Sequence, residues 1–443
     1  MEQGIIFGLL LFFIGIMTGL PLCWVFLGST IVAIFLIQAS LSFMAGTFYH
    51  AIDNYVLMAI SFFIWAGNLI AESGISARLV RLSYALVGRI RGGLVDVGIV
   101  AAVFMGALTG SSLPVIAALI PILVPGLEKL GYQRRYVTAV LCSSSFLGYL
   151  IPPSVPGLLY CLVAQQSVAA VFLSTVIPGL ILAGGYILVN TFICHRYYMP
   201  SKEAPKFPST FTGTIREIGA STWSALPALG CPFIVLVGIY GGIFTPNEAG
   251  AIAALYTALV GFFMYREMKL KGFWECSKTT VVAMGMLAFL LGFGTVFTRL
   301  LIREGFGELM TQFVLSISEN KYAILLMMNI LLLILGMFID GIPIIIIVVP
   351  LIMPLIQKLD VNLIHLGAII VLNIGIGVVT PPYAISIFLG TKLSNVPYEQ
   401  LVPPMMIFLF LVGIPTLMLT TYFPWLSLWL PSLILGSKMV GGP

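Results

Sequence analysis

The sequence predicts an all-α polytopic membrane protein made of two inverted-topology repeats, each with a re-entrant helical hairpin and a broken transmembrane helix. The chain is 60% hydrophobic and only 8% charged, and its mean hydropathy is +1.11, whereas soluble domains are about 25% charged. Apolar segments of about 20 residues, the length of a membrane-spanning helix, recur from end to end. The third observation is an internal repeat that relates the two halves of the chain.

The internal repeat is recognised from the positions of its prolines. When the first half is shifted by 229 positions, five of its prolines coincide with prolines of the second half, the pairs being Pro114 and Pro343, Pro121 and Pro350, Pro125 and Pro354, Pro152 and Pro381, and Pro153 and Pro382. Gly148 coincides with Gly377 at the same shift. Five matches without a gap indicate a true internal repeat. The repeats extend over 1–215 and 216–443, and the polar stretch 195–217 joins them.

Charge predicts how the repeats lie in the membrane. Basic residues concentrate in four stretches of the first 280 residues, at 78–91, 129–135, 196–216 and 266–278. The positive-inside rule places all four in the cytoplasm. Glu2 is the only early charge, so we expect the N-terminus to lie outside, and the C-terminus as well. Because the second repeat begins inside, equivalent segments run in opposite directions.

These orientations define the expected elements. The stretch 94–128 has basic residues at both ends and is too short for two spans with a loop, so we expect a hairpin that enters from the cytoplasm. The second hairpin, 322–357, then enters from outside. The other expected segments are flanking helices within 1–93 (spans near 4–20, 22–38 and 54–73), a broken helix over 136–173, a span over 174–194, flanking helices within 216–320, a second broken helix over 363–397 and a C-terminal span over 401–423.

The hairpin tips and helix breaks predict the functional site. The hairpins turn at Thr109–Pro114 and Asp340–Pro343, and the helices break at Ile151–Pro156 and Thr380–Pro382. Non-helical backbone at membrane depth is tolerated only where it is buried in protein or lines a wet cavity. We therefore expect the two tips and two breaks to meet near the midplane. Their unwound carbonyls suit sodium, and the N-termini of the following half-helices suit a carboxylate.

The predicted sodium- and substrate-binding residues belong to these segments or to the polar positions beside them. They are Gly110, Ser111, Ser112, Pro114, Ser143, Ser144, Ser145, Gly148, Ile151, Pro152, Pro153, Asp340, Gly341, Pro343, Asn373, Gly377, Thr380, Pro381 and Pro382. Sodium is assigned to five of them, Ser111, Ser112, Ser144, Asn373 and Thr380. In the repeat, Ser111 aligns with Asp340 and Ser144 with Asn373. Thr109 and Ser154 are further polar residues of the same segments.

Simpler roles remain open for several of these residues. Ser111, Ser112 and Asp340 are also suited to capping the second helix of each hairpin. The serines at 143–145 are also suited to close helix packing. An intramembrane carboxylate is nevertheless costly and usually functional, so Asp340 is the strongest single indication of a site.

Other residues near the expected membrane boundaries have two interpretations as well. Arg299 and Arg303 lie near the outer end of a span, where they either attract an anion or extend their charged groups to the interface. Trp425 and Trp429 in the C-terminal segment are typical of side chains that anchor a helix at the interface.

Several function classes are excluded by what the sequence lacks. The six cysteines form no CxxC pair and the three histidines lie far apart, so neither predicts a metal site. There is no GxxxxGK[ST] motif for ATP, and the net charge of +5 is spread over loops. Asp340 has no partner His or Glu for catalysis within the membrane. We therefore expect neither an enzyme nor a nucleic-acid-binding protein, and no organic cofactor.

The chain resembles a known family at these same residues. The segments GALTGSS, SSSFLGYLIPPSVP, FTPNEAGAIAALYTALVG, GMFID and PLIMPLIQKLDVNLIHLGAIIVLNIGIGVVTPP look like the large membrane subunit of tripartite ATP-independent periplasmic (TRAP) transporters. The resemblance covers essentially the whole chain. It implies a secondary active transporter of the bacterial inner membrane that imports an organic acid, such as a C4-dicarboxylate, sialic acid or another sugar acid, by sodium-coupled symport and an elevator motion.

The resemblance also implies how the parts work together. The hairpins and broken helices would form the moving transport domain, and the helices within 1–93 and 216–320 would form the scaffold and arms. A periplasmic binding protein would deliver the substrate, and a small four-helix membrane subunit, expected as a separate chain, would complete the complex. The alternative is a stand-alone sodium-coupled dicarboxylate or citrate carrier, which needs no binding protein.

Overall fold

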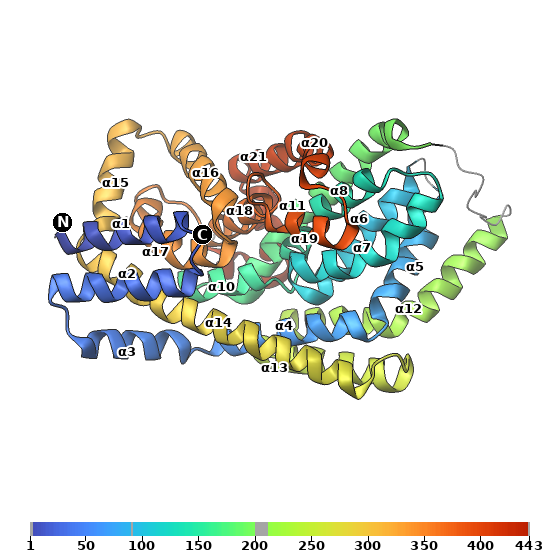
Figure 1. Ribbon diagram of the computed structural model, residues 1–443, viewed down its shortest axis with the longest axis horizontal. Helices are drawn as coiled ribbons and strands as arrows, with labels where there is room; N and C mark the ends of the chain where they lie inside the picture. Colours follow the sequence, from blue (N-terminus) through green and yellow to red (C-terminus); the bar gives the residue numbers. More distant parts are fainter. Residues whose placement is uncertain (1–2, 90–91, 200–210, 442–443) are drawn as a thin grey trace.

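The computed structural model describes residues 3–89, 92–199 and 211–441, and over these residues the fold is all-α (Figure 1). Nine helices of this part of the chain are long and apolar enough to cross a membrane, or ten if one bent pair counts as a single span. Helices pair their backbone N–H and C=O groups internally, as a bilayer requires. The predicted class, an all-α polytopic membrane protein, is confirmed.

The first half consists of flanking helices, a hairpin and a broken helix. The flanking helices are α1 (Gln3–Met17), α2 (Leu22–Ile37), α3 (Leu41–Ile52), α4 (Tyr55–Glu72) and α5 (Ile75–Val87). The hairpin consists of α6 (Gly93–Thr109) and α7 (Ser112–Lys129). The broken helix consists of α8 (Arg134–Ser144), α9 (Leu147–Leu150) and α10 (Val155–Ala164), and it is followed by α11 (Val168–Ile193).

The second half repeats this order. Its flanking helices are α12 (Phe211–Tyr240), α13 (Pro246–Leu259), α14 (Leu270–Arg303) and α15 (Phe306–Ile317). The hairpin consists of α16 (Lys321–Phe338) and α17 (Gly341–Lys358), and the broken helix consists of α18 (Leu363–Gly377) and α19 (Ile385–Ser394). The remaining helices are α20 (Tyr398–Phe408), α21 (Ile414–Tyr422) and α22 (Trp425–Leu435).

Helices of the two halves correspond in position. α7 and α17 begin 229 positions apart and end 229 positions apart. The expected boundary of the first broken helix at 173 is wrong, because α10 ends at Ala164 and α11 begins at Val168. Gln165 adopts a left-handed conformation that ends α10, and the Ser167 side chain accepts a hydrogen bond from Ala170 at the start of α11. The short helices α3 and α22 were not expected.

Packing between the halves interlocks them. The half-helix α10 of the first repeat packs against the hairpin helix α17 of the second, and α19 of the second repeat packs against α7 of the first. The longest helix, α14, runs along the molecule and packs against α2, α3, α4 and α17 (Figure 1). The hairpin of each repeat is therefore packed against a half-helix of the other repeat. The hairpin tips lie inside the molecule.

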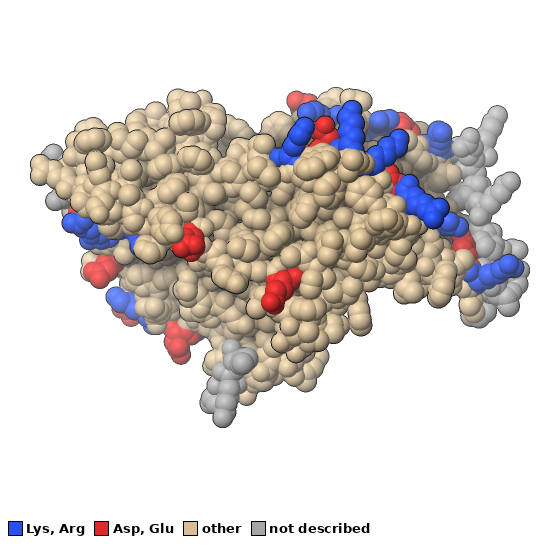
Figure 2. All heavy atoms as spheres, turned by 90° about the horizontal axis from the view of Figure 1, so that it is seen from below, with Lys and Arg blue, Asp and Glu red and all other residues tan. Residues whose placement is uncertain are grey.

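Charged side chains are unevenly spread over the surface. Figure 2 shows Lys and Arg gathered along one margin of the visible face, a smaller charged group at the opposite end, and a broad zone between them that carries only isolated acidic side chains. Large apolar side chains are exposed on many helices, including Trp223, Phe233 and Phe263. An exposed apolar zone of this extent is what a lipid-facing surface requires.

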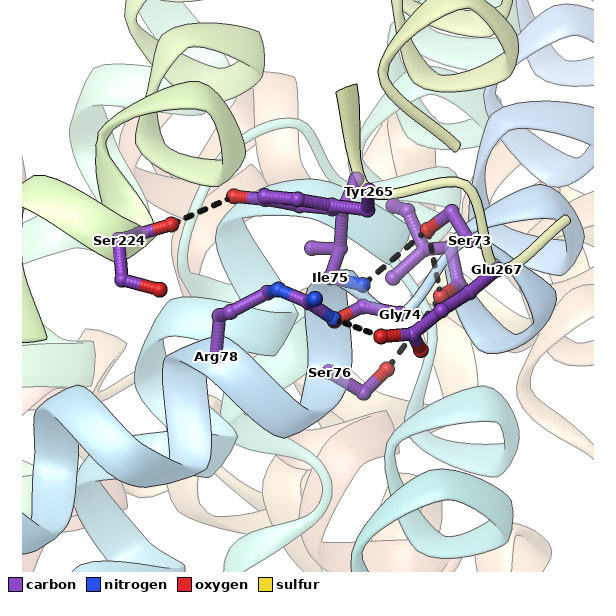
Figure 3. Close-up of polar contacts among 9 residues, drawn as sticks. Ser73, Gly74, Ile75, Ser76, Arg78, Ser224, Tyr265 and Glu267 are labelled. Atoms are coloured by element: carbon purple, nitrogen blue, oxygen red, sulfur yellow. Dashed lines mark hydrogen bonds and ion pairs between the residues drawn. The ribbon is translucent and has the colours of Figure 1, made fainter. Parts of the chain in front are cut away.

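A polar cluster joins three of the flanking segments (Figure 3). Arg78 of α5 forms an ion pair with Glu267 and donates a hydrogen bond to the carbonyl of Gly74 at 2.9 Å. Its guanidinium carbon lies 4.0 Å from the centre of the Tyr265 ring. The Tyr265 hydroxyl donates to the carbonyl of Ser224 in α12 at 2.9 Å. The cluster thus ties α5 and α12 to the turn that precedes α14.

We expect Arg78→Met to destabilise the protein by about 1–2 kcal/mol, because it removes a cation–π contact and an ion pair together. The measurement is the melting temperature of the purified protein in detergent. Arg81→Met is the matched control, since Arg81 lies on the same helix with an exposed side chain. Equal melting temperatures for the two variants would contradict the structural role of the cluster.

Candidate functional site

The first hairpin tip docks onto the first helix break. α6 ends at Thr109, Gly110 adopts a positive φ of 60°, and Ser111 is extended before α7 begins. The carbonyl of Gly110 accepts a hydrogen bond from the amide of Val155 at 3.0 Å. A Cβ atom at Gly110 would lie 2.6 Å from the carbonyl oxygen of Pro153. Glycine is therefore required at this tip both by conformation and by space.

The second hairpin tip is capped by its own carboxylate. α16 ends at Phe338, and the side chain of Asp340 accepts a hydrogen bond from the amide of Gly341 at 2.8 Å. The capping role considered for Asp340 is thus observed. Ser111, at the equivalent position of the first hairpin, makes no side-chain cap. The two tips share a backbone plan but differ in charge.

The two helix breaks also differ in their surroundings. Residues 151–154 are all buried, and the side chain of Ser154 accepts a hydrogen bond from Gly157 at 3.1 Å, which caps α10. The second break extends from Val378 to Ala384, and Pro382 and Tyr383 within it are exposed. Both proline pairs contain a cis peptide bond. The second break therefore faces the surface, whereas the first is enclosed.

Both tips and the helix ends that flank both breaks line one cavity of about 120 Å³. The first residues of four helices lie in its wall, namely Ser112 of α7, Val155 of α10, Gly341 of α17 and Ile385 of α19. A helix N-terminus carries partial positive charge and N–H groups without helical partners. Side chains cap α10 and α17, but α7 and α19 have no side-chain cap. This arrangement suits an anion with two or more acceptor oxygens.

Four of the predicted residues line this cavity: Ser111, Ser112, Asp340 and Gly341. Tyr149 also lines it, and its hydroxyl accepts a hydrogen bond from Ser112 at 3.2 Å. Tyr149 is not among the residues predicted from sequence, although its phenol lies beside a predicted break, in GYLIPP. The remaining wall is apolar and consists of Leu113, Val155, Pro156, Ile342, Ile374, Val378 and Ile385.

The other predicted residues lie outside the cavity wall. Of these, Ser144 and Ser145 donate to helix carbonyls three residues earlier, and Thr380 donates to the carbonyl of Ile376. The residues not found in the cavity wall are Gly110, Pro114, Ser143, Ser144, Ser145, Gly148, Ile151, Pro152, Pro153, Pro343, Asn373, Gly377, Thr380, Pro381 and Pro382. A hydroxyl that donates its proton keeps lone pairs for a cation, so sodium binding at Ser144 and Thr380 stays a prediction.

Gly148 and Gly377 have a packing role. A Cβ atom on Gly106 of α6 would lie 2.7 Å from the Cα of Gly148, and a Cβ on Gly336 of α16 would lie 3.0 Å from the Cα of Gly377. Each hairpin's first helix therefore crosses the broken helix of its own repeat at a pair of glycines. Such crossings allow backbones to approach more closely than any other residue permits.

Asn373 belongs to a buried polar network. Its side-chain amide donates to the backbone carbonyl and the side-chain oxygen of Asn329, at 3.1 and 3.0 Å. Asn329 in turn donates to the Thr421 hydroxyl at 2.8 Å. These donations fix the Asn373 side chain and leave its Oδ1 buried without a hydrogen-bond partner, as is the Ser143 hydroxyl. Buried acceptors without donors are costly unless a cation or water occupies the site.

With this geometry in view, the chain can be compared with known proteins. A family profile described as "Tripartite ATP-independent periplasmic transporter, DctM component" matches residues 9–426. The chain therefore belongs to the DctM family of TRAP transporter components. The resemblance to TRAP transporters, inferred from the sequences of the hairpin tips and helix breaks, is confirmed. These sequences lie inside the matched range.

Individual relatives cover the chain to different extents. The chain is 32% identical to the sialic acid TRAP transporter large permease protein SiaM of Vibrio cholerae, over 98% of this chain and 99% of that protein. It is 32% identical to the C4-dicarboxylate TRAP transporter large permease protein DctM of the same organism, over 91% and 92%. It spans 59% of the isethionate TRAP transporter permease protein DctMQ of Oleidesulfovibrio alaskensis, with 32% identity over 87% of this chain.

A solved membrane transporter shares the fold. The crystal structure of the YdaH transporter from Alcanivorax borkumensis, described as having an unusual topology, superposes with a TM-score of 0.58 over 86% of each chain. The sequence identity is 13%. At this identity the likeness concerns the arrangement of helices alone.

We expect Gly148→Ala and Gly377→Ala to destabilise the protein by about 1–3 kcal/mol, because the added methyl meets backbone atoms that cannot rotate away. At Gly148 the nearest is the Ser111 carbonyl oxygen at 2.7 Å, and at Gly377 it is the Gly336 Cα at 2.8 Å. The melting temperature reports the change. Gly184→Ala is the control, since no atom lies within 4 Å of its added methyl. A lower melting temperature for Gly184→Ala than for both test variants would contradict this packing role.

Two substitutions of Asp340 distinguish the stability contributed by its hydrogen bond to the helix N-terminus from that contributed by its charge. In a choline buffer without sodium, we expect Asp340→Ala to lose about 1 kcal/mol of stability, whereas Asp340→Asn keeps the cap and melts close to the unchanged protein. Thermal unfolding followed by tryptophan fluorescence measures both. If both variants melt equally low, the charge of Asp340, rather than its cap, is the stabilising feature.

Proposed function

We propose that this chain is the large membrane subunit of a TRAP transporter that imports an organic acid, of the C4-dicarboxylate, sialic acid or other sugar-acid type, with a sodium gradient. Family membership supports transport, and the names of the relatives support an organic anion. A periplasmic binding protein delivers the substrate, and a small four-helix membrane subunit completes the complex. The protein is not an enzyme and carries no organic cofactor.

The main structural support for this proposal is that the N-termini of four helices meet at one small cavity. Each N-terminus contributes roughly half a positive elementary charge. The wall also offers the hydroxyls of Ser112 and Tyr149. A carboxylate fits such a site without any arginine, because backbone N–H groups supply the donors. Neither α7 nor α19 has a side-chain cap. At α19 the amide of Ser386 donates to the carbonyl of Val378, so the N-terminus of α7 is the main candidate for binding the substrate.

Sodium binds, in this proposal, at Ser111 and Ser112 in the cavity wall and at Ser144, Asn373 and Thr380 outside it. The buried and unpartnered oxygens of Ser143 and Asn373 are the strongest support, because oxygen ligands are what a hard cation prefers. Ser144 and Thr380 retain hydroxyl lone pairs nearby in sequence. A cation here offsets the negative charge of Asp340 and of the substrate. Binding of the two ions is then mutually favourable, which is the basis of symport.

The meeting of the two tips supports re-entrant hairpins. Ser112 and Gly341 begin α7 and α17, which come from hairpins of opposite repeats, and both line the same cavity. If the hairpins enter from opposite sides, as charge predicts, a shared cavity places both tips inside the bilayer. In this proposal the basic stretches face the cytoplasm of a bacterial inner membrane, and both termini lie on the periplasmic side.

An elevator motion follows from the division between scaffold and transport elements. The hairpins and broken helices, which interlock across the repeats, move as one body. The long helix α14, with α1 to α5, α12, α13 and α15, forms the scaffold and arms. The substrate then crosses the membrane with the cavity rather than through a pore.

Thermal unfolding of the protein in the presence of sodium tests the proposed coupling of transport to sodium. At a sodium concentration 100 times the dissociation constant, bound sodium stabilises the folded state by about 2.7 kcal/mol, so the melting temperature in sodium chloride should exceed that in choline chloride of equal ionic strength. Ser144→Ala and Asn373→Ala should reduce this difference. Ser174→Ala is the control, because Ser174 is a buried helical serine that likewise donates to a carbonyl three residues earlier. Equal melting in both salts would count against sodium coupling.

Substrate uptake into proteoliposomes distinguishes a TRAP transporter subunit from a stand-alone carrier. The TRAP assignment requires uptake to depend on the binding protein and the small subunit as well as on the sodium gradient. Uptake by this chain alone, unaffected by the other two components, would favour the stand-alone alternative.

A further inference from the structure

A second cavity, of about 250 Å³, lies between the scaffold and the transport elements. Its scaffold side is formed by α14, by the last turn of α3 and by the α3–α4 turn, and its transport side by the end of α10 and by α17. Its wall includes His50, Asn54, Leu162, Val163, Thr295 and Arg299. Family membership does not assign a function to this cavity.

The chemistry of the wall favours an organic anion. Arg299 and His50 are its titratable side chains, and no acidic side chain is among the described residues that line it. The side-chain oxygen of Asn54 accepts a hydrogen bond from Val56 at 2.9 Å, so the amino group of Asn54 is left to donate. Asn54 also caps the positive N-terminal end of α4. Leucine, valine and isoleucine supply the apolar part of the wall.

Two features near the second cavity would favour a cation over an anion, but both have a weaker effect than Arg299. Asp53 is exposed and lies outside the lining set. The carbonyl end of α10 also faces this region, but the Gln165 side chain donates to the carbonyl of Leu162 at 2.7 Å and satisfies it. Arg299, whose side chain is exposed, is therefore the one permanently charged side chain among the described residues of the wall.

The position of the cavity links it to the site at the hairpin tips. α10 contributes Val155 and Pro156 to the tip cavity and Leu162 and Val163 to this one. Seven residues of helix separate these contributions by about 10 Å. α17 likewise runs from Gly341 at the tip cavity to Ile346 and Pro350 here. The same two helices thus form walls of both cavities.

A specific contact holds the scaffold against α17 at this place. Pro350 has no N–H, so the carbonyl of Ile346 lacks its helical donor. The hydroxyl of Thr298 in α14 donates to that carbonyl at 3.3 Å. One helix turn of α14 therefore presents Thr298 to α17 and Arg299 to the cavity.

We propose that this second cavity is an anion-binding station at which the carboxylate or sulfonate group of the substrate is held by Arg299 before it reaches the tip cavity. The station lies toward the end of α14 that is remote from the basic stretch 266–278, which is the periplasmic end in the orientation proposed above. Its role in transport rests on the proposed function. The binding of small organic anions by Arg299 does not.

Charge-selective modification of a cysteine placed in the cavity tests this inference. The full-length chain with Thr295→Cys is reacted with 2-sulfonatoethyl methanethiosulfonate, itself a small organic anion, and with its trimethylammonium counterpart. The unaltered chain supplies the background of the six native cysteines, five of which are buried. We expect the anionic reagent to react faster than the cationic one by about threefold or more, the order expected for unit charges within one Debye length.

Added to Thr295→Cys, Arg299→Gln should abolish this preference and Arg299→Lys should retain it. Arg303→Gln is the matched control, because Arg303 ends the same helix and does not line the cavity. Melting temperatures show that each variant is folded. An unchanged rate ratio in Arg299→Gln, or an equal loss in Arg303→Gln, would overturn the inference. Either outcome leaves the sodium-dependent melting untouched, so failure here is distinguishable from failure of the proposed function.

Discussion

The structure depends on holding four helix N-termini together around one small cavity. Their partial positive charges repel one another, so the arrangement is tolerable only where acceptors are close. The protein supplies two acceptors itself, Ser154 on α10 and Asp340 on α17, and leaves α7 and α19 without a side-chain cap. In the proposed function, N-terminal N–H groups that lack a side-chain cap are the physical basis of anion binding. They also explain why a transporter of anions needs no arginine at this place.

An N-terminus reaches the interior of a membrane protein only at a hairpin tip or a helix break. Proline suits such breaks because it lacks the N–H that a continuous helix would require. The glycine pairs Gly106–Gly148 and Gly336–Gly377 then let each hairpin cross its broken helix at backbone contact. Packing of α10 on α17 and of α19 on α7 brings the two repeats together. These contacts join the tips and breaks into one packed unit, which is the part that moves against α14 in the proposed function.

Inverted repeats give the two halves similar backbones but different chemistry. The first break is buried and is hydrogen-bonded to the tip at Gly110, whereas the second is exposed at Pro382 and Tyr383. The second half alone has a carboxylate at its tip and an asparagine network around Asn373. Pseudo-symmetric backbones allow alternating access from two sides. Differences in side chains give the two sides of the site different hydrogen-bonding groups.

The sequence by itself determined the fold class, the 229-residue repeat, and the positions of the hairpins and breaks, because hydropathy and proline placement act through local backbone chemistry. It also identified Ser111, Ser112, Asp340 and Gly341, which line the cavity. Only the tertiary structure decided that Gly148 and Gly377 are packing contacts, that Tyr149 joins the site, and that Arg299 faces a second cavity. These properties depend on which segments meet across the repeats, and contacts between residues distant in sequence leave no local pattern.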